Sequence, residues 1–502
     1  MHLGRYLAFW TQRRGDALFM ACDGERLSWR ALDRASGALA AHLAAEGVQP
    51  GDRLGCLLGN ALPWTVAFAA SLRLGTIFVP LNALFGRFEL EQIAADAECA
   101  AILSTPSLIA KLGIEDSGVP ADTVRLYRRG GRTSVDSYAD IVASGAAFAD
   151  EPRSDDDVLI VGYTSGTTGL PKGVMLTHRA VDAAIQGLML NFGLRGGEER
   201  ALILAPLPFT GGVISSLAVQ LVTGGSGWLE KTVDPVRALQ LLREERITVF
   251  GGVPALWERI ARAPGFADAD LSSLRAAYTG GAPVPRPLLE QFRAKGVTIR
   301  QQYGFSEACG GVSSQDEAGA AANPESCGRA LPGVELEVRD TAGRRVAVGE
   351  VGEVHARGAQ LMAGYWRQPE ATAAAFDDGW YRTGDLARLE ADGGLVIVDR
   401  KKSMLISGGV NVYPAEVERA LTQVPGVVEA VVFGLPSAEW GDEVVAIVHG
   451  AGLEAPAILD RLREMIGAYK TPKRLRISPA PLPRTASNKI ARTGLPGLFG
   501  RL

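Results

Sequence analysis

The segment from Tyr163 to Val174 concentrates the residue types that bind phosphate. It holds four Ser/Thr hydroxyls, three glycines and one lysine, and the apolar run 158–161 before it predicts a buried strand. Glycines let backbone N–H groups approach a ligand, hydroxyls add hydrogen-bond donors, and the lysine supplies positive charge. The segment therefore predicts a loop that wraps the phosphates of a nucleoside triphosphate.

The spacing within this segment differs from that of the P-loop of kinases. Gly169 stands three residues before Lys172, and Gly173 follows where a Ser or Thr would hold magnesium. A Gly/Ser/Thr cluster can also be a plain surface loop. Taken alone, the segment leaves both a different phosphate loop and no phosphate loop open.

Four further segments carry chemically useful side chains at long intervals. They are residues 302–307 (QYGFSE), 380–386 (WYRTGDL), 399–402 (DRKK) leading into 407–414 (SGGVNVYP), and 483–490 (PRTASNKI). In this order, together with the first segment, they resemble the core motifs of the adenylate-forming superfamily, which contains acyl-CoA synthetases, adenylation domains and beetle luciferases. The resemblance covers essentially the whole chain.

The resemblance implies a two-step activation of a carboxylic acid. The carboxylate attacks the α-phosphorus of ATP, which forms an acyl-adenylate and releases pyrophosphate, and a thiol then displaces AMP. Because the first step brings two anions together, positive charge and aligned donors must offset their repulsion in the transition state.

The resemblance assigns the nucleotide-binding residues one by one. Ser306 contacts the α-phosphate, Glu307 binds Mg²⁺, Asp385 accepts from the ribose hydroxyls, and Arg400 contacts ribose or phosphate. Tyr303 stacks on adenine, although an aromatic residue after an apolar run is also common in a core. The remaining implied ATP-binding residues are Thr164, Ser165, Gly166, Thr167, Thr168, Gly169 and Lys172 on the β- and γ-phosphates, and Gly281, Ala282, Pro283, Gln302 and Gly304 near the nucleoside.

The C-terminal segments carry the residues that the resemblance assigns to catalysis and domain movement. Lys489 bridges the carboxylate and the α-phosphate in the first step, and Asp399 is the hinge about which the C-terminal domain rotates for the second. After that rotation Ser407, Gly408 and Gly409 line the path of the CoA thiol arm, because glycine lets the arm approach the backbone. Asn488 replaces the usual Gly and tolerates the same left-handed geometry.

The acid-binding pocket is implied to lie around three segments. Its candidate residues are Phe209, Thr210, Val213, Gly252, Gly310 and Gly311. No Asp stands there to pair with an α-ammonium, and no Lys or Arg to pair with a second carboxylate, which argues against amino acids and malonate-like acids. Gly304 stands where acetate enzymes carry Trp. An apolar monocarboxylic acid is expected, either a medium or longer fatty acid or a ring acid.

The bulk composition excludes several other classes of function. The chain has 502 residues and a net charge of −4, so no overall basic field recruits nucleic acid. Five widely spaced cysteines form neither a disulfide framework nor a zinc site. The sequence predicts no signal peptide and no membrane span, hence a cytoplasmic protein, as a monomer or a homodimer.

The pattern of elements predicts an α/β fold. Helices over about 28–46 and 234–245 alternate with short apolar strands such as 247–250, which is typical of helix-covered sheets. A small β-barrel-like unit is expected over 334–398, within a large domain 1–398. A small, mobile α+β domain over 399–502 follows, with helices near 415–422 and 456–466 and strands near 427–433 and 444–448.

Three functions remain open on the sequence. The leading hypothesis is an AMP-forming acyl-CoA ligase that uses ATP, Mg²⁺, CoA and the acid. The second is an enzyme that loads the acyl group onto the phosphopantetheine of a carrier protein. The third is a non-catalytic acyl- or nucleotide-binding homologue, against which the joint presence of Lys172, Glu307, Asp385 and Lys489 argues.

Overall fold

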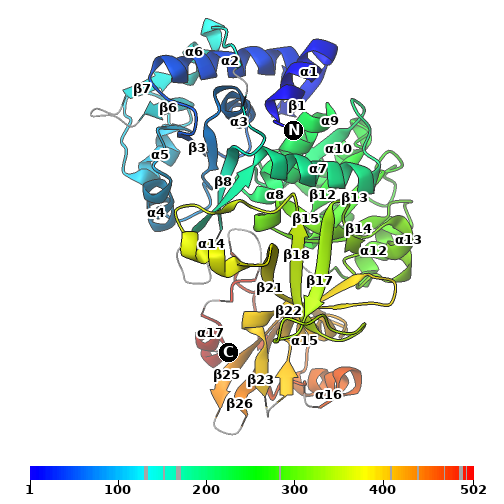
Figure 1. Cartoon of the computed structure of the whole chain (residues 1–502). Coiled ribbons are helices and arrows are strands. Elements are labelled where there is room, and N and C mark those ends of the chain that lie inside the picture. Colours follow the sequence, from blue (N-terminus) through cyan, green and yellow to red (C-terminus); the bar gives the residue numbers. More distant parts are fainter. Residues whose placement is uncertain are drawn as a thin grey trace. The chain divides into compact units, whose positions relative to one another are not determined.

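The structure, a computed structural model, describes ten stretches of the chain (Figure 1). They are residues 1–128, 134–150, 153–164, 171–281, 284–407, 410–437, 440–468, 470–485, 490–492 and 494–501. Contacts divide the chain into two compact units, Met1–Glu335 with Ala356–Tyr381, and Leu336–His355 with Arg382–Leu502. We describe the units separately, as the first unit and the second unit.

One sheet of the first unit carries the start and the end of the predicted phosphate loop. Its eight strands are, in spatial order, β19 (Gly364–Tyr365), β9 (Lys172–Thr177), β8 (Val158–Thr164), β4 (Ile77–Pro80), β3 (Arg53–Leu57), β5 (Ala101–Ser104), β6 (Arg125–Arg128) and β7 (Ser134–Ser137). The central strands β8, β4, β3 and β5 are parallel, whereas β9 runs antiparallel to β8. The two fully buried apolar residues Leu159 and Ile160 on β8 confirm the predicted buried strand.

The other sheet of the first unit has nine strands. Their order is β16 (Arg329–Ala330), β15 (Gly310–Ser314), β14 (Ile299–Phe305), β13 (Ala276–Gly280), β12 (Val249–Gly252), β10 (Arg200–Ile203), β11 (Ser226–Leu229), β1 (Leu18–Cys22) and β2 (Glu25–Ser28). Strands β10, β12, β13 and β14 are parallel neighbours, so their carboxyl ends lie along one edge. The strand predicted at 247–250 forms over Val249–Gly252, and the Thr248 N–H just before it already donates to the Arg200 carbonyl (2.8 Å).

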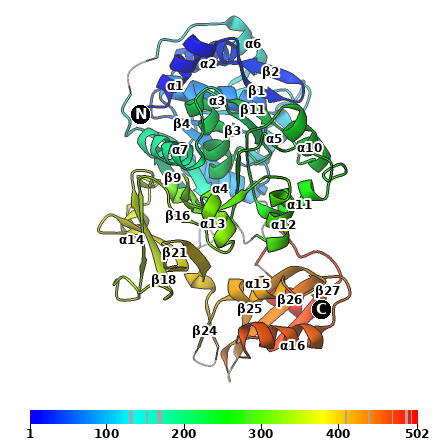
Figure 2. The same cartoon turned by 90° about the vertical axis from the view of Figure 1, so that its right-hand side faces the viewer.

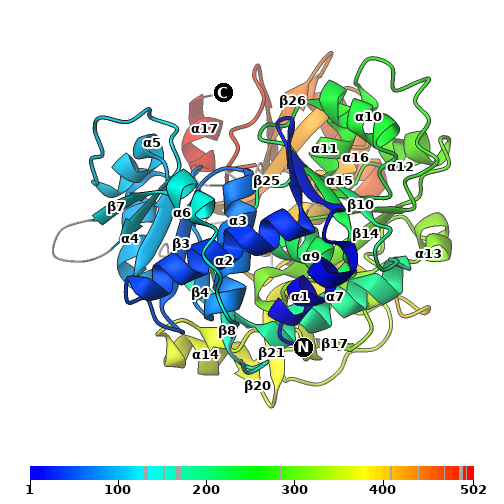
Figure 3. The same cartoon turned by 90° about the horizontal axis from the view of Figure 1, so that it is seen from above.

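Helices cover both sheets of the first unit. They are α1 (Gly4–Arg14), α2 (Trp29–Ala45), α3 (Leu62–Leu74), α4 (Arg87–Ala97), α5 (Pro106–Ile109), α6 (Tyr138–Ser144), α7 (His178–Phe192), α8 (Thr210–Gly212), a π-helical turn (Val213–Ala218), α9 (Val219–Thr223), α10 (Pro235–Glu244), α11 (Pro254–Ala261), α12 (Arg286–Arg293), α13 (Glu317–Ala322) and α14 (Pro369–Ala375). Viewed from above, α1, α2 and α3 lie side by side across the middle of the view and contact one another (Figure 3).

The two helices predicted for the first unit form as expected. Ser28 caps α2, since its hydroxyl accepts from the Ala31 N–H (3.1 Å), and Asp234 caps α10 through the Val236 N–H (2.8 Å). The buried face of α2 joins a core shared with α3, α7 and both sheets, which includes Leu39, Phe68 and Ile160. A second apolar cluster of this unit packs Phe250, Ala277 and Ile299 of β12, β13 and β14.

The second unit contains part of one sheet and the whole of another, which helices cover. Strands β17 (Val334–Arg339), β18 (Gly352–Gly358) and β21 (Trp380–Leu389) each cross from one unit to the other, and β22 (Leu395–Arg400) pairs with β21. The second sheet has the order β24 (Val410–Val412), β23 (Leu405–Ser407), β26 (Gly441–Gly450) and β25 (Val427–Ser437), with β27 (Arg474–Ser478) on β26.

Two helices complete the core of the second unit. Helices α15 (Pro414–Leu421) and α16 (Ala455–Ile466) pack on the sheet of β25 and β26, with Val417 and Leu462 fully buried (Figure 2). A last helix, α17 (Leu495–Arg501), packs Phe499 against Val431 and Val445. These elements match the predicted helices and strands after residue 399.

The predicted domain boundary and the compact units fall at different positions. Residues 336–355 and 382–398 group with the C-terminal residues, whereas 356–381 group with the first unit. The predicted hinge at Asp399 and the boundaries 1–398 and 399–502 stay predictions. In the part of the chain that the structure describes, no helix has the length and hydropathy needed to cross a membrane.

Candidate active site

The predicted site residues of the first unit follow the carboxyl ends of its parallel strands. Gly252 ends β12, Gly280 ends β13 and Phe305 ends β14, and the pairs Gly252↔Thr279 and Gly280↔Gln302 place these ends side by side. Phe209 and Thr210 follow β10, the next parallel strand of this sheet. The edge formed by these strand ends is where open α/β sheets bind their ligands.

The described ends of the phosphate loop lie on neighbouring strands. Thr164 ends β8 and pairs directly with Lys172, which begins β9. The Tyr163 hydroxyl donates to Asp96 at the end of α4 (2.6 Å). Burial raises the pKa of Tyr163, and the bond to Asp96 raises it further. The two described ends of the predicted phosphate loop are therefore held next to each other.

Glu307 lies in a short 3₁₀ turn, Ser306–Ala308, that directly follows β14. The Tyr365 hydroxyl donates to Glu307 Oε1 (3.0 Å), and the Tyr381 hydroxyl lies 3.4 Å from that of Tyr365. The Met362 N–H donates to the Glu307 carbonyl (2.7 Å). These contacts bring Glu307 together with the strand pair β9–β19, where Lys172 also lies.

The residues between β14 and β15 adopt a tight antiparallel pairing. Tyr303 is 8% exposed and packs on Phe305, with ring centroids 5.8 Å apart. A Cβ at Gly304 would lie 2.0 Å from the Gly310 carbonyl oxygen, so this approach requires glycine. The buried Gln302 amide nitrogen has no hydrogen-bond partner among the described residues, which leaves a donor for a ligand.

The described candidates for the acyl pocket all belong to the first unit. A Cβ at Gly162 would lie 3.2 Å from Thr210 Oγ1, and one at Gly310 would lie 3.2 Å from Ser215 Oγ. Val213 is fully buried and begins the π-helical turn, a feature that is frequent at functional sites. Gly311 pairs with Gly304, and Gly252 packs beside Leu256.

The second unit carries a separate group of predicted nucleotide-binding residues. Asp385 on β21 pairs in register with Arg400 on β22, and their side chains form an ion pair (Nε–Oδ1, 2.5 Å). Glu353 accepts from the Gly384 N–H (3.2 Å) and from the Lys401 ammonium (2.8 Å). The turn that presents Asp385 is thus held from two sides.

The predicted hinge residue is held by backbone donors. The Asp399 carboxylate accepts from the N–H of Arg400 (2.6 Å) and from the N–H of Ala415 in α15 (2.8 Å). Burial raises the pKa of Asp399, and these two bonds oppose that rise. Ser407 ends β23 and is buried, and its hydroxyl has no partner among the described residues.

Several predicted site residues lie outside the described residues. They are Ser165, Gly166, Thr167, Thr168, Gly169, Ala282, Pro283, Gly408, Gly409 and Lys489. Their described neighbours Thr164, Gly281, Ser407 and Ile490 are placed by the structure. The roles of the whole predicted set stay predictions.

The donor set around Glu307 fits Mg²⁺ that arrives with a nucleotide. Mg²⁺ uses one or two protein carboxylates together with substrate phosphates and water. The described residues contain no group of three or more His, Cys, Asp or Glu that could hold a metal by itself, and Glu307 supplies one carboxylate beside the phosphate-loop lysine. A metal there would neutralise phosphate charge.

The structure adds site residues that the sequence reasoning did not assign. Tyr365 and Tyr381 contact Glu307 from positions 58 and 74 residues further along the chain (365 − 307 and 381 − 307). Tyr381 lies within the segment 380–386, and this was the available signal. The contact of both tyrosines with Glu307 depends on the pairing of β19 with β9, which no sequence pattern indicated.

Comparisons with known proteins match both halves of the chain. The sequence profile of the AMP-binding enzymes matches residues 7–366, and that of the AMP-binding enzyme C-terminal domain matches residues 416–489. A feruloyl-CoA synthase of Amycolatopsis sp is 35% identical and covers 98% of this chain and 99% of its own length. The long-chain-fatty-acid–CoA ligase FadD13 of Mycobacterium tuberculosis is 34% identical, covering 94% of this chain and 92% of its own.

A solved structure extends these comparisons to the fold. ATP-bound MatB from Rhodopseudomonas palustris superposes with a TM-score of 0.87 at 29% identity, and covers 99% of both chains. The match extends over the α/β architecture of the large N-terminal part and the small α+β part, as the sequence predicts.

Proposed function

The chain belongs to the AMP-binding enzyme family, and on that basis we propose that it is an AMP-forming acid–CoA ligase for an apolar monocarboxylic acid. The observation that carries the proposal is the match of both family profiles together with relatives that correspond over nearly their whole length. These relatives are acid–thiol ligases by name. The proposal places the reaction in the cytoplasm, where ATP and CoA are available.

In the first half-reaction, the predicted site residues of the first unit have separate roles. The phosphate loop, with Thr164 and Lys172 at its base, holds the pyrophosphate that leaves. Glu307 binds the Mg²⁺ that neutralises the phosphates, and the adjacent Ser306 hydroxyl contacts the α-phosphate. Tyr303 and Gln302 lie near the end of β14 and contact the adenine ring in this proposal. Tyr303 is 8% exposed, so a small part of its surface is available to the ring.

The C-terminal residues act in both half-reactions. Lys489 offsets the repulsion between the acid carboxylate and the α-phosphate during adenylation. Asp385 binds the ribose hydroxyls with one carboxylate oxygen, while Arg400 holds the other. A rotation about Asp399 then replaces Lys489 with the segment after Ser407, along which CoA approaches.

The acid is proposed to be a ring acid or a medium to longer fatty acid. One relative, named for feruloyl-CoA, supports the ring acids. Another, named for long-chain fatty acids, supports the fatty acids. The described pocket candidates are uncharged, namely Phe209, Thr210, Val213, Gly252, Gly310 and Gly311. An uncharged pocket disfavours acids with a second carboxylate or an ammonium group.

The test is an acid panel with ATP, Mg²⁺ and CoA. The panel contains aryl acids, cyclic acids, fatty acids of graded length, acetate, malonate and amino acids, and AMP and thioester are measured for each. The proposal predicts equal amounts of AMP and thioester with ring or fatty acids. Adenylate without thioester would instead support a carrier-protein acceptor, and no adenylate with any acid would support a non-catalytic homologue.

A further inference from the structure

The segment Met362–Trp366 is hydrogen-bonded to β9, the strand that begins with Lys172. The Ala363 N–H donates to the Met175 carbonyl (2.9 Å), and the Trp366 N–H donates to the Gly173 carbonyl (2.7 Å). Tyr365 pairs with Val174, on β9. Because the Met362 N–H also donates to the Glu307 carbonyl, this one segment is bonded to both halves of the ATP-binding machinery.

The Tyr365 side chain also contacts both Glu307 and Lys172. Its hydroxyl donates to Glu307 Oε1 at 3.0 Å, and its ring centroid lies 5.0 Å from Lys172 Nζ. Both distances are within the ranges of a hydrogen bond and of a cation–π contact. One residue thus contacts the carboxylate proposed for the metal and the ammonium proposed for the phosphates.

The surroundings restrict the Tyr365 side chain. The residue is 8% exposed, so its ring lies almost entirely within the protein. The Tyr381 hydroxyl lies 3.4 Å from the Tyr365 hydroxyl, and its ring stacks on Phe305 with centroids 5.1 Å apart, which restricts the Tyr365 side chain further.

We propose that Tyr365 is a positioning residue that couples the metal-binding carboxylate to the phosphate-binding lysine. Its hydroxyl fixes the orientation of Glu307 for a divalent cation, and its ring fixes the Lys172 ammonium. Residues that bond to a metal ligand commonly contribute tenfold or more to metal affinity. The proposal rests on the proposed function, because it assumes that Glu307 and Lys172 bind metal and ATP.

The two parts of the Tyr365 side chain can be removed separately. Tyr365→Phe removes the hydroxyl and keeps the ring, whereas Tyr365→Leu removes both. The matched control is Tyr127→Phe, which removes a Tyr hydroxyl that donates to Asp116 (2.9 Å) on another part of the same unit. Thermal unfolding of each variant reports any general loss of structure.

The direct readout is Mn²⁺ binding, measured by electron paramagnetic resonance on the full chain with α,β-methylene-ATP. For Tyr365→Phe we expect the Kd of Mn²⁺ to rise about tenfold, while the Kd of the nucleotide without metal stays within about twofold. For Tyr365→Leu we expect both constants to rise. Tyr127→Phe should behave as the wild type, and the KM for the acid should not change in Tyr365→Phe.

Three results separate the outcomes. If Tyr365→Phe binds Mn²⁺ as tightly as the wild type, or more tightly, the hydroxyl does not position Glu307 and the inference is wrong. If Tyr365→Leu raises only the metal Kd, the ring does not position Lys172. If the wild-type protein forms no acyl-adenylate with the acid panel, the proposed function fails, whatever the Mn²⁺ titrations show.

Discussion

A carboxylate that binds a metal must keep one orientation, and the groups around Glu307 restrict its side chain. Tyr365 donates directly, and Tyr381 lies close behind it. At the residue scale, the proposed chemistry therefore depends on neighbours that are distant in sequence as much as on the motif residues themselves.

Lys489→Ala should separate the two half-reactions. The lysine is proposed to offset charge repulsion only during adenylation, so acyl-adenylate formation should fall by about a hundredfold to a thousandfold. Thioester formation from supplied acyl-adenylate and CoA should stay within about threefold of the wild type. Rapid-quench assays of each half-reaction provide the measurement.

The matched control for that substitution is Lys473→Ala. Lys473 lies in the same unit, and its ammonium is 4.2 Å from the Trp440 ring centroid. The control should leave adenylation within about twofold. A Lys489→Ala variant that loses both half-reactions equally would contradict a domain rotation between them.

At the element scale, the β14–β15 hairpin carries as many predicted site residues as the β8–β9 hairpin. The pairing shifts register between Tyr303 and Gly304, and this irregularity brings the two backbones close together at Gly304. The strand ends then turn into the 3₁₀ turn of Glu307. The hairpin geometry places Glu307 at the sheet edge, where the Tyr365 hydroxyl contacts its carboxylate.

Gly304→Ala should disrupt this hairpin. The added Cβ would lie 2.0 Å from the Gly310 carbonyl oxygen and 2.6 Å from the Gly311 Cα, so backbone atoms would have to move. We expect a loss of about 2–3 kcal/mol in the free energy of unfolding, measured by urea titration, together with weaker ATP binding.

A suitable control is Gly59→Ala, because nothing lies within 4 Å of a Cβ at that position. That variant should unfold within about 0.5 kcal/mol of the wild type. Equal stability of Gly304→Ala and Gly59→Ala would show that the hairpin can relax.

At the scale of the whole molecule, local signals in the sequence identified elements better than contacts between them. The caps Ser28 and Asp234 and the apolar run of β8 predicted their elements correctly, because a few neighbouring residues determine each of them. The Tyr365–Glu307 contact could not be predicted, since it depends on the pairing of β19 with β9. The resemblance supplied the site residues and their order, while the structure supplied their neighbours.

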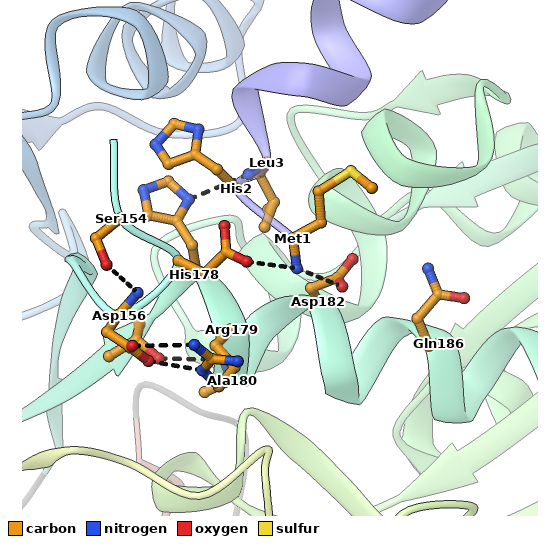
Figure 4. Close-up of polar contacts among 12 residues, drawn as sticks. Met1, His2, Leu3, Ser154, Asp156, His178, Arg179, Ala180, Asp182 and Gln186 are labelled. Atoms are coloured by element: carbon orange, nitrogen blue, oxygen red, sulfur yellow. Dashed lines mark hydrogen bonds and ion pairs between the residues drawn. The ribbon is translucent and has the colours of Figure 1, made fainter. Parts of the chain in front are cut away.

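The packing of the N-terminal segment predicts a loss of stability in acid. His178 begins α7 and is buried, its ring stacks on His2 with centroids 3.7 Å apart, and its Nδ1 accepts from the Leu3 N–H (Figure 4). Burial, then His2 and the Met1 ammonium, lowers the pKa of His178 to about 2. Asp155 and Asp182 face the Met1 ammonium at 3.7 and 2.8 Å and partly balance these charges.

The direction of the pH effect follows from the two pKa values. The unfolded chain takes up a proton at His178 near pH 6.5 and the folded chain only near pH 2, so stability is lost as the pH falls below 6.5. We expect a loss of about 2 kcal/mol between pH 8 and pH 5 from this residue. Tryptophan fluorescence reports the unit concerned, because Trp440 is the one tryptophan of eight outside it.

His178→Gln removes the titrating group and keeps an acceptor for the Leu3 N–H. Its urea midpoint should change less between pH 8 and pH 5 than that of the wild type. The control is His42→Gln, since that imidazole is partly exposed beside Asp136 (3.2 Å). If His178→Gln loses as much stability in acid as the wild type, the buried imidazole is not the cause.

The central claim is that the protein activates an acid by transferring AMP to it, and pyrophosphate exchange tests this step most directly. The enzyme is incubated with ATP, Mg²⁺, labelled pyrophosphate and a ring or fatty acid, without CoA. The account predicts label in ATP that depends on the acid, and release of AMP with thioester once CoA is added. Formation of ADP, or no acid-dependent exchange with any acid of the panel, would contradict it.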